Sequence, residues 1–146
     1  MVESTYSNRL ISFNTIDVNT IIKGKKSIGN WLNQVIEKEG HELGFISISL
    51  CSDKHLLKIN KSVLQHDYYT DIITFQLNEK QEAIEGDIYI SIDRVKDNAK
   101  TLKIRWGDEL KRVMVHGVLH LCGYKDKTKK DSELMRKKEN ECLSLL

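Results

Sequence analysis

The sequence lacks proline altogether, and it contains no repeat, low-complexity tract or interdomain linker. Nothing therefore marks a boundary between two folding units, and 146 residues are enough to bury most of the unfolded chain's apolar surface in one core. Apolar residues make up 40% of the chain and charged residues 30%, a balance typical of a globular protein and not of a disordered one. We expect residues 1–146 to form a single domain.

Long apolar runs are also missing. No segment approaches the roughly 18 consecutive apolar residues that a membrane-spanning helix needs. Residues 1–10 (MVESTYSNRL) lack the basic start and apolar stretch of a secretion signal. The three cysteines, Cys51, Cys122 and Cys142, are odd in number and scattered, which favours free thiols in a reducing compartment over a disulfide framework. We expect a cytoplasmic protein that makes no membrane contact.

A large excess of charge of one sign is absent as well. The 23 Lys and Arg residues and 21 Asp and Glu residues leave a net charge of +2, so composition alone does not predict nucleic-acid binding. Any basic surface must come from clustering, as in residues 23–26 and 125–130. Such runs are usually solvated, and contact with an RNA backbone is the alternative interpretation.

Short β-like runs and amphipathic helices share the rest of the chain. Strands are predicted at residues 9–13 (an edge strand), 45–50, 71–77 and 87–92, the last two as a hairpin around an acidic loop at 78–86. Helices are predicted from residue 27 to Gly40, after an N-cap at Asp53, from Asp93 to about residue 104, from Asp108 to Gly123, and over 129–146. The order predicts an α+β (mixed α/β) fold, in which a small mixed sheet of about four strands packs with about five helices.

The strongest chemical signal is a pair of histidines, His116 and His120, four residues apart in a predicted helix. That spacing places both imidazoles on one helix face, about one turn apart, where two nitrogens can reach one ion. Gly123 would then reverse the chain and bring Asp126 back as an oxygen ligand. Three protein ligands leave a fourth position for water, which the metal would polarise toward hydroxide. The alternative is that the two histidines share a helix face by chance and bind no metal.

The residues around this pair resemble a known family. The segment H-G-V-L-H-L-C-G-Y-K-D at 116–126 is similar to the His-Gly-x-Leu-His-Leu-x-Gly-Tyr-Asp-His signature of the YbeY endoribonucleases. Upstream, T-D-I-I-T-F at 70–75 and E-G-D-I-Y-I-S at 85–91 resemble two further blocks of that family. The pairs Ile59-Asn60 and Met135 with Glu139 extend the likeness in the same order.

The resemblance implies a zinc-dependent, single-strand-specific endoribonuclease that acts in late 3′-end maturation of small-subunit (16S) ribosomal RNA and in ribosome quality control. Its partners would be ribosomal RNA and the small ribosomal subunit. One Zn²⁺ ion would be held by His116, His120 and Asp126, with His116 also contributing to activation of the bound water. Lys111 and Arg112 are the expected RNA contacts. The oligomeric state is not predicted.

Two positions depart from the family pattern. Asp126 stands where the family usually has a third histidine, a replacement that zinc chemistry accepts but that lowers the charge of the site by one. Leu64 stands where the family usually has an arginine, and leucine cannot make charge-assisted bonds to phosphate. Another cation would have to replace that arginine, and the candidates are Arg105, Lys111, Arg112 and Lys61.

Other polar residues carry weaker signals. Asp71 and Asp87 would orient a ligand histidine or line the cleft, or would be ordinary strand-start aspartates. Thr70 would meet a phosphate or bond its own backbone. Cys122 points to a different helix face from His120, so a buried thiol is expected there and not a ligand. The remaining histidines with no predicted chemistry are His41, His55 and His66.

Gly117 follows His116 where zinc peptidases of the His-Glu-x-x-His type carry a glutamate base, so a standard peptidase is disfavoured. An open zinc site also serves hydrolysis of other bonds. The alternative from another class is a metal-stabilised ribosome-assembly factor without turnover, which the loss of arginine at Leu64 favours.

Overall fold

The computed structural model describes residues 10–79 and 82–146, which form a four-stranded mixed sheet and five helices. The strands lie in the order β1 (Ile11–Thr15), β2 (Leu43–Cys51), β4 (Ile84–Ser91), β3 (Ile72–Gln76). β1 and β4 run parallel to β2, whereas β3 and β4 form the antiparallel hairpin predicted from the sequence. The predicted loop at 78–86 was too long, because β4 already begins at Ile84, where it pairs with β2. The predicted fold class and the edge position of the first strand are confirmed. Arg9, the first residue of that predicted strand, lies outside the described residues.

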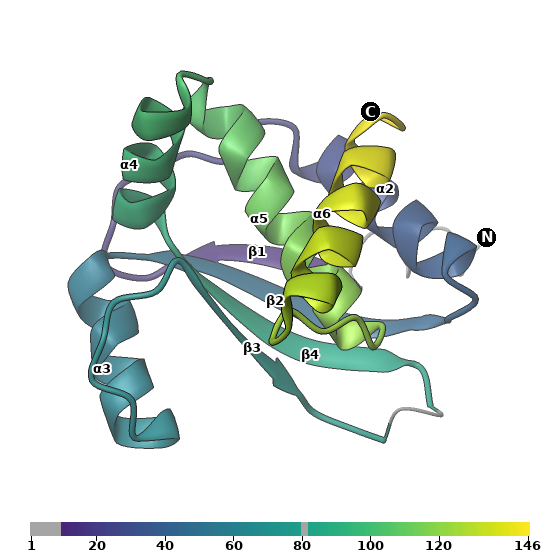
Figure 1. Ribbon diagram of the computed structural model, residues 1–146, viewed down its shortest axis with the longest axis horizontal. Coiled ribbons are helices and arrows are strands. Elements are labelled where there is room, and N and C mark those ends of the chain that lie inside the picture. The colour runs from purple at the N-terminus through teal and green to yellow at the C-terminus, as the bar shows by residue number, and fades with distance from the viewer. Residues whose placement is uncertain (1–9, 80–81) are drawn as a thin grey trace.

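The two faces of the sheet carry different helices (Figure 1). One face, called here the core face, is covered by α2 (Lys25–Lys38), α4 (Ile92–Leu102), α5 (Trp106–Leu121) and α6 (Lys129–Leu143). The opposite face, called here the α3 face, carries α3 (Asp53–Leu64) near one edge. In the described ranges, no helix combines the length and hydropathy needed to cross a membrane.

Strand alternation explains why the core face holds most of the apolar core. In β2 and β4, Ile46, Ile48 and Ile88 are fully buried beneath the helices. The residues between them, including Ser47 and Asp87, point to the α3 face and are only half-buried. A smaller cluster lies under α3, and it consists of Cys51, Leu56 and Ile73 with Ile59, Phe75 and Tyr89 partly buried around them.

Four predicted helix starts were one or two residues too late: α2 begins at Lys25 and not at 27, α4 begins at Ile92 and not at Asp93, and α3 and α5 differ in the same direction. Ser52, not Asp53, is the N-cap of α3, because its backbone is extended and its hydroxyl accepts a hydrogen bond from the backbone N–H of His55. Asp53 is instead the first helical residue, and its carboxylate binds Arg94 at 2.6 Å. Likewise α5 begins at Trp106, two residues before the predicted Asp108.

Helix α5 lies close against β3 and β4 because one of its residues has no side chain. A Cβ added at Gly117 would stand 2.8 Å from Cδ1 of Ile72 and 3.1 Å from Cδ1 of Ile88. The helix ends at Leu121, and Gly123 has the positive φ of 110° that reverses the chain, as predicted. This reversal directs the following loop, with Asp126, back along α5.

Candidate functional site

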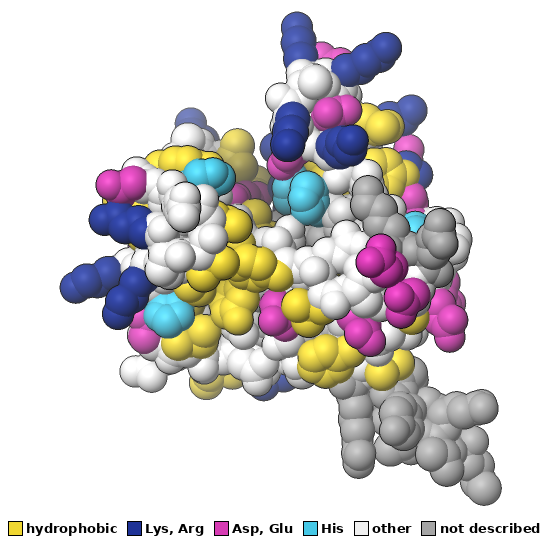
Figure 2. Space-filling view, turned by 90° about the horizontal axis from the view of Figure 1, so that it is seen from below, with side chains coloured by type: hydrophobic (Ala, Val, Ile, Leu, Met, Phe, Trp, Pro, Cys, Tyr) yellow, Lys and Arg dark blue, Asp and Glu magenta, His cyan; other side chains and the backbone are white. Residues whose placement is uncertain are grey.

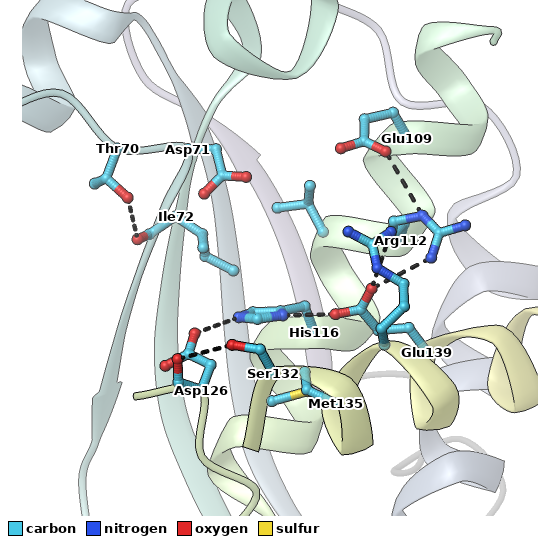
Figure 3. Close-up of a pocket in the computed structure, with 12 residues that line it drawn as sticks. Thr70, Asp71, Ile72, Glu109, Arg112, His116, Asp126, Ser132, Met135 and Glu139 are labelled. Carbon is cyan, nitrogen blue, oxygen red and sulfur yellow. Dashed lines mark hydrogen bonds and ion pairs between the residues drawn. The ribbon is translucent and has the colours of Figure 1, made fainter. Parts of the chain in front are cut away.

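A cleft of about 350 Å³ opens on the core side of the molecule, between the start of β3, helix α5 and the first half of α6. Figure 3 shows its lining in close-up. The lining is mostly polar and comes from three stretches of the chain, which meet only in the folded structure: Thr70, Asp71 and Ile72; Glu109, Arg112, Val113 and His116; and Asp126, Ser132, Met135, Arg136 and Glu139.

His116 lies between two carboxylates. Its Nδ1 is 2.7 Å from Oε2 of Glu139, and its Nε2 is 3.2 Å from Oδ2 of Asp126. Because an ionised carboxylate only accepts hydrogen bonds, Nδ1 carries the proton that is donated to Glu139. A neutral ring with this tautomer presents the lone pair of Nε2 toward Asp126 and the cleft.

Glu139 holds the histidine ring rigidly because it is itself fixed. Its side chain is 5% exposed, and its Oε1 accepts a hydrogen bond from Nη1 of Arg112 at 3.3 Å. The same Nη1 donates to Oδ1 of Asn140 at 3.0 Å. Helices α5 and α6 are therefore joined at the cleft by hydrogen bonds from Arg112 and His116 to one buried carboxylate.

The proton affinities of this pair follow from burial and mutual contact. Burial alone lowers the pKa of His116, but the hydrogen bond and charge of Glu139, with Asp126 and Asp71, raise that pKa above its ordinary value. Burial by itself raises the pKa of Glu139, yet the hydrogen bond and charge of His116 and the neighbouring arginines hold it below the usual range. Each member of the His116–Glu139 pair thus favours the charged form of the other.

Two further carboxylates line the cleft, Asp71 just before β3 and Glu109 in α5. Burial raises the pKa of Asp71, partly offset by His116. Burial also raises the pKa of Glu109, against the opposing charge of Arg112, whose Nε is 3.7 Å from Oε1 of Glu109. That oxygen is buried and has no hydrogen-bond partner among the described residues. With four carboxylates and two guanidinium groups, the cleft has an acidic balance.

The structure brings together some of the predicted site residues but not all. His116 and Asp126 meet as the chain reversal predicted, and Arg112 lies in the same cleft. His120 is exposed and Lys111 is half-buried, and neither belongs to the cleft lining in the described part of the chain. Thr70 and Asp71 line the cleft, with the Thr70 hydroxyl 3.4 Å from the carbonyl oxygen of Ile72.

The remaining candidate residues lie outside the cleft lining in the described part of the chain. Asp87 lies on the α3 face of β4, so it does not reach His116. Burial raises the pKa of the Cys122 thiol to about 12, which agrees with an inert thiol and not a metal ligand. Lys61 forms an ion pair with Asp67 at 3.3 Å, and Arg105 is exposed at the start of α5.

The donor set fits a divalent metal in its chemistry. A metal-binding histidine usually donates its second ring N–H to a carboxylate, and His116 does so to Glu139. The Nε2 atom and the Asp126 carboxylate already face each other, in a cleft whose acidic balance favours a cation. Within residues 10–79 and 82–146, no three His, Cys, Asp or Glu side chains converge on one point. His120 lies one helical turn from His116, and its side chain is exposed and outside the cleft lining in the described residues.

Several cleft residues lie on α6 and had no predicted role in the site. Ser132, Met135, Arg136 and Glu139 recur at intervals of three, one and three residues, which places them on one helix face. That spacing was visible in the sequence. Glu109 carried no comparable signal, because an acidic residue in the first turn of a helix is common for dipole reasons alone.

Comparisons with known proteins agree on one family. Residues 12–146 match the family model described as Endoribonuclease YbeY. Among curated proteins, the chain is similar to Endoribonuclease YbeY of Cytophaga hutchinsonii, with 52% identity over 85% of this chain and 87% of that protein. It is also similar to the protein of the same name from Flavobacterium psychrophilum, with 48% identity over 93% and 96% of the two chains.

A solved structure shows a related fold. The solution structure of a protein from Thermotoga maritima superposes with a TM-score of 0.63 and 27% sequence identity. The match covers 92% of this chain and 87% of the other. The sheet and helices described above are therefore shared well beyond the histidine segment.

Proposed function

The chain belongs to the YbeY endoribonuclease family, and on that premise we propose that it cleaves single-stranded RNA with one divalent metal ion, zinc being the expected one. We further propose that its substrate is the 3′ end of the small-subunit (16S) ribosomal RNA precursor, and that it acts in ribosome quality control in the cytoplasm. Membership of the family supports RNA cleavage, and the resemblance of the sequence motifs supports the role in 16S ribosomal RNA maturation.

One observation carries the metal part of the proposal: the half-buried His116 is held between Asp126 and the buried Glu139. A histidine oriented in this way keeps Nε2 available as a ligand, and removal of such a supporting carboxylate typically lowers metal affinity by roughly 10- to 100-fold. An ion would be held by His116, His120 and Asp126. When bound, it would polarise a water molecule or a phosphate oxygen.

The residues of the chain perform the binding and positioning. Glu139 keeps the proton on Nδ1 of His116, and Arg112 keeps Glu139 in place. Arg136 lies at the same cleft with 58% of its side chain exposed, and its ion pair there is a long one, 3.7 Å from Nη1 to Oε1 of Glu139. We propose that it turns from this contact to a phosphate while Arg112 remains engaged with its carboxylate and amide partners. Arg136 is therefore a better phosphate contact than Lys111, which lies outside the cleft lining in the described residues.

The decisive experiment combines metal analysis with RNA cleavage. The purified protein should contain close to one zinc per chain and should cut a labelled single-stranded oligoribonucleotide faster than the same sequence in a duplex. His116→Ala should lose both metal and cleavage, whereas His41→Ala, outside the cleft lining, should retain both. Full metal content in Asp126→Ala would show that the proposed third ligand is wrong.

The products identify the attacking group. If a ribose 2′-hydroxyl attacks the phosphorus, cleavage leaves a 2′,3′-cyclic phosphate on the upstream fragment. If water attacks directly, no cyclic phosphate forms. End-group analysis of one cleaved oligonucleotide separates these two routes.

A second candidate, a ribosome-assembly factor without turnover, is favoured by Leu64. This residue is 38% exposed at the end of α3, at the position where the family usually has an arginine. Binding to small ribosomal subunits without any RNA cleavage, equally in wild type and His116→Ala, would support this candidate. Metal-dependent cleavage that is lost in the His116 variant would exclude it.

A further inference from the structure

The connection between α3 and β3 displays three ring side chains at the surface. Tyr68 is 56% exposed and Tyr69 54% exposed, and His66 is exposed as well. These three residues are called here the aromatic loop. Single exposed aromatic residues are common, but a contiguous exposed group often marks an interaction site, so the grouping of three rings on one short segment points to a ligand.

The aromatic loop is held in a defined conformation. Asn60 is 2% exposed, and its carbonyl oxygen accepts a hydrogen bond from the backbone N–H of His66 at 2.9 Å. Its side-chain amide donates to the carbonyl oxygen of Tyr68, also at 2.9 Å. Gln65 closes α3 in the left-handed conformation, with φ of 57°. The rings therefore project from a fixed backbone, which reduces the entropy lost when a ligand binds.

Each ring is supported on one side. The rings of His66 and Tyr68 are stacked, with centroids 5.2 Å apart and an interplanar angle of 18°, and the Tyr68 hydroxyl lies 3.1 Å from Nδ1 of His66. The guanidinium carbon of Arg94 lies 5.4 Å from the centre of the Tyr69 ring, and Arg94 is itself held by Asp53. With half of their surface exposed, the two tyrosines offer further flat area for stacking.

The aromatic loop leads directly into the cleft, because Thr70 and Asp71 follow it in sequence and line the cleft opposite His116 (Figures 1 and 3). Across the cleft, the loop that carries Asp126 and the start of α6 expose four lysines that have no carboxylate within 4.0 Å in the described part of the chain: Lys125, Lys127, Lys129 and Lys130. Figure 2 shows basic side chains projecting from the start of α6 and hydrophobic side chains gathered beside α3.

From this arrangement we propose that the aromatic loop is a binding subsite for unpaired nucleobases, which stack on Tyr68 and Tyr69 while the backbone of the same strand crosses the cleft toward the lysines. The inference rests on the proposed ribonuclease function. Bases of a duplex are already stacked on their neighbours, so a subsite of this kind selects single-stranded RNA. Aromatic platforms combined with basic residues are a common solution for binding single strands without sequence preference.

The test measures binding of a fluorescein-labelled single-stranded RNA whose 2′-hydroxyls are methylated, which prevents 2′-hydroxyl attack. The Tyr68→Leu/Tyr69→Leu double variant should bind at least about 10-fold more weakly, whereas Tyr68→Phe/Tyr69→Phe should stay within about 2-fold because stacking is retained. Trp106→Leu is the matched control, since Trp106 is another partly exposed aromatic residue, outside the cleft lining, and should leave affinity unchanged. Urea unfolding of each variant verifies that the fold is intact.

Abasic nucleotides provide the second arm. Removal of the stacked bases from the oligonucleotide should weaken binding to the wild type but should have little further effect on the Leu/Leu variant, because the same contact is already lost. If both the variant and the abasic RNA bind like their parents while wild type still cleaves RNA, the subsite is wrong and the ribonuclease function stands.

Two other results also overturn the subsite. If wild-type protein with zinc neither binds nor cleaves any single-stranded RNA, the proposed function fails and the subsite fails with it. If the Leu/Leu variant binds RNA normally but no longer binds small ribosomal subunits, the aromatic loop is a protein contact and not a base platform.

Discussion

The core face of the sheet lies under four helices, whereas in the described part of the chain the α3 face is covered by one helix near one edge (Figure 1). The core face carries the continuous apolar core and the cleft with His116. The α3 face carries the smaller cluster of Cys51, Leu56 and Ile73, with partly buried rings around it, and the aromatic loop follows α3. The apolar core and the cleft thus lie on one face of the sheet, and the more exposed side chains lie on the other.

This division has a physical cause in the chain. Most core-face residues of β2 and β4 are large and aliphatic, and their burial beneath the helices removes a large apolar area from water. On the α3 face the same strands carry Ser47, Asp87 and Tyr89, whose polar groups can remain near water. One helix, α3, is enough to cover the few apolar side chains on this face, such as Cys51 and Ile73.

The largest expected effect compares one leucine from each face. Leu32 in α2 and Leu56 in α3 are both fully buried. Leu32→Ala should lower the free energy of unfolding by about 4 kcal/mol, and Leu56→Ala by about 2 kcal/mol, because the half-buried neighbours of Leu56 can relax into the cavity. Urea unfolding of both variants measures the difference. Equal losses would mean that the two faces are packed equally tightly.

A second prediction addresses the site on the core face. Glu139→Gln should lower zinc affinity by roughly 10- to 100-fold, since the amide cannot supply the negative charge that His116 faces. Competition with a chromogenic chelator measures this affinity. Glu133→Gln, an exposed change on the same helix, is the control. Unchanged affinity in Glu139→Gln would separate Glu139 from the metal site.

A third prediction adds charge to the α3 side. Leu64→Arg should change the free energy of unfolding by less than about 0.5 kcal/mol, because the side chain is exposed. RNA affinity at low salt should rise, and the slope of log affinity against log salt should steepen by about one unit. Leu64→Gln has similar length without the charge and should show neither effect. A steeper slope in both variants would contradict a phosphate contact.

The smallest effect is expected where α3 is attached to the rest of the chain. Hydrogen bonds from the Ser52 hydroxyl and backbone N–H lower the pKa of Asp17. A lowered folded-state pKa stabilises the fold above the unfolded-state pKa, and this stabilisation is lost as the pH falls through the folded-state value. Because Asp17 is exposed, the gain is less than about 1 kcal/mol. Comparison of Asp17→Asn with wild type from about pH 6 to about pH 2 should show a gap that closes on acidification; a constant gap would exclude this origin.

The sequence predicted the order of elements well because each has a clear period. The helix through Ile28, Trp31 and Leu32 and the alternation of β2 depend on local spacing alone. The predicted start of α3 was displaced because Ser52 and Asp53 are both good N-cap residues, and only the backbone conformation decides between them. The start of α5 was displaced because its N-cap, Arg105, makes no side-chain cap hydrogen bond that the sequence could indicate.

For the site, local geometry was predictable and distant contacts were not. The turn at Gly123 brings Asp126 to His116 over ten residues, and the sequence indicated it. Glu139 reaches the same ring from another helix, and the docking of α6 that makes this possible is a tertiary property. The surface position of His120 also depends on how α5 is rotated against the sheet, which a helical spacing cannot specify.

Helix α6 buries only Met135, Glu139 and Cys142, and the carbonyl oxygen of Cys142 accepts a hydrogen bond from Nε1 of Trp31 at 2.8 Å. An element with so few buried residues should open by local fluctuation well before the whole domain unfolds. Its amides should then exchange with deuterium sooner than those of α5. Because Glu139 belongs to α6, each opening of this helix would break the Glu139–His116 hydrogen bond and release the His116 ring, while the rest of the fold stays intact. The lifetime of the assembled site would be set by the opening rate of this one helix, and not by the global stability of the protein.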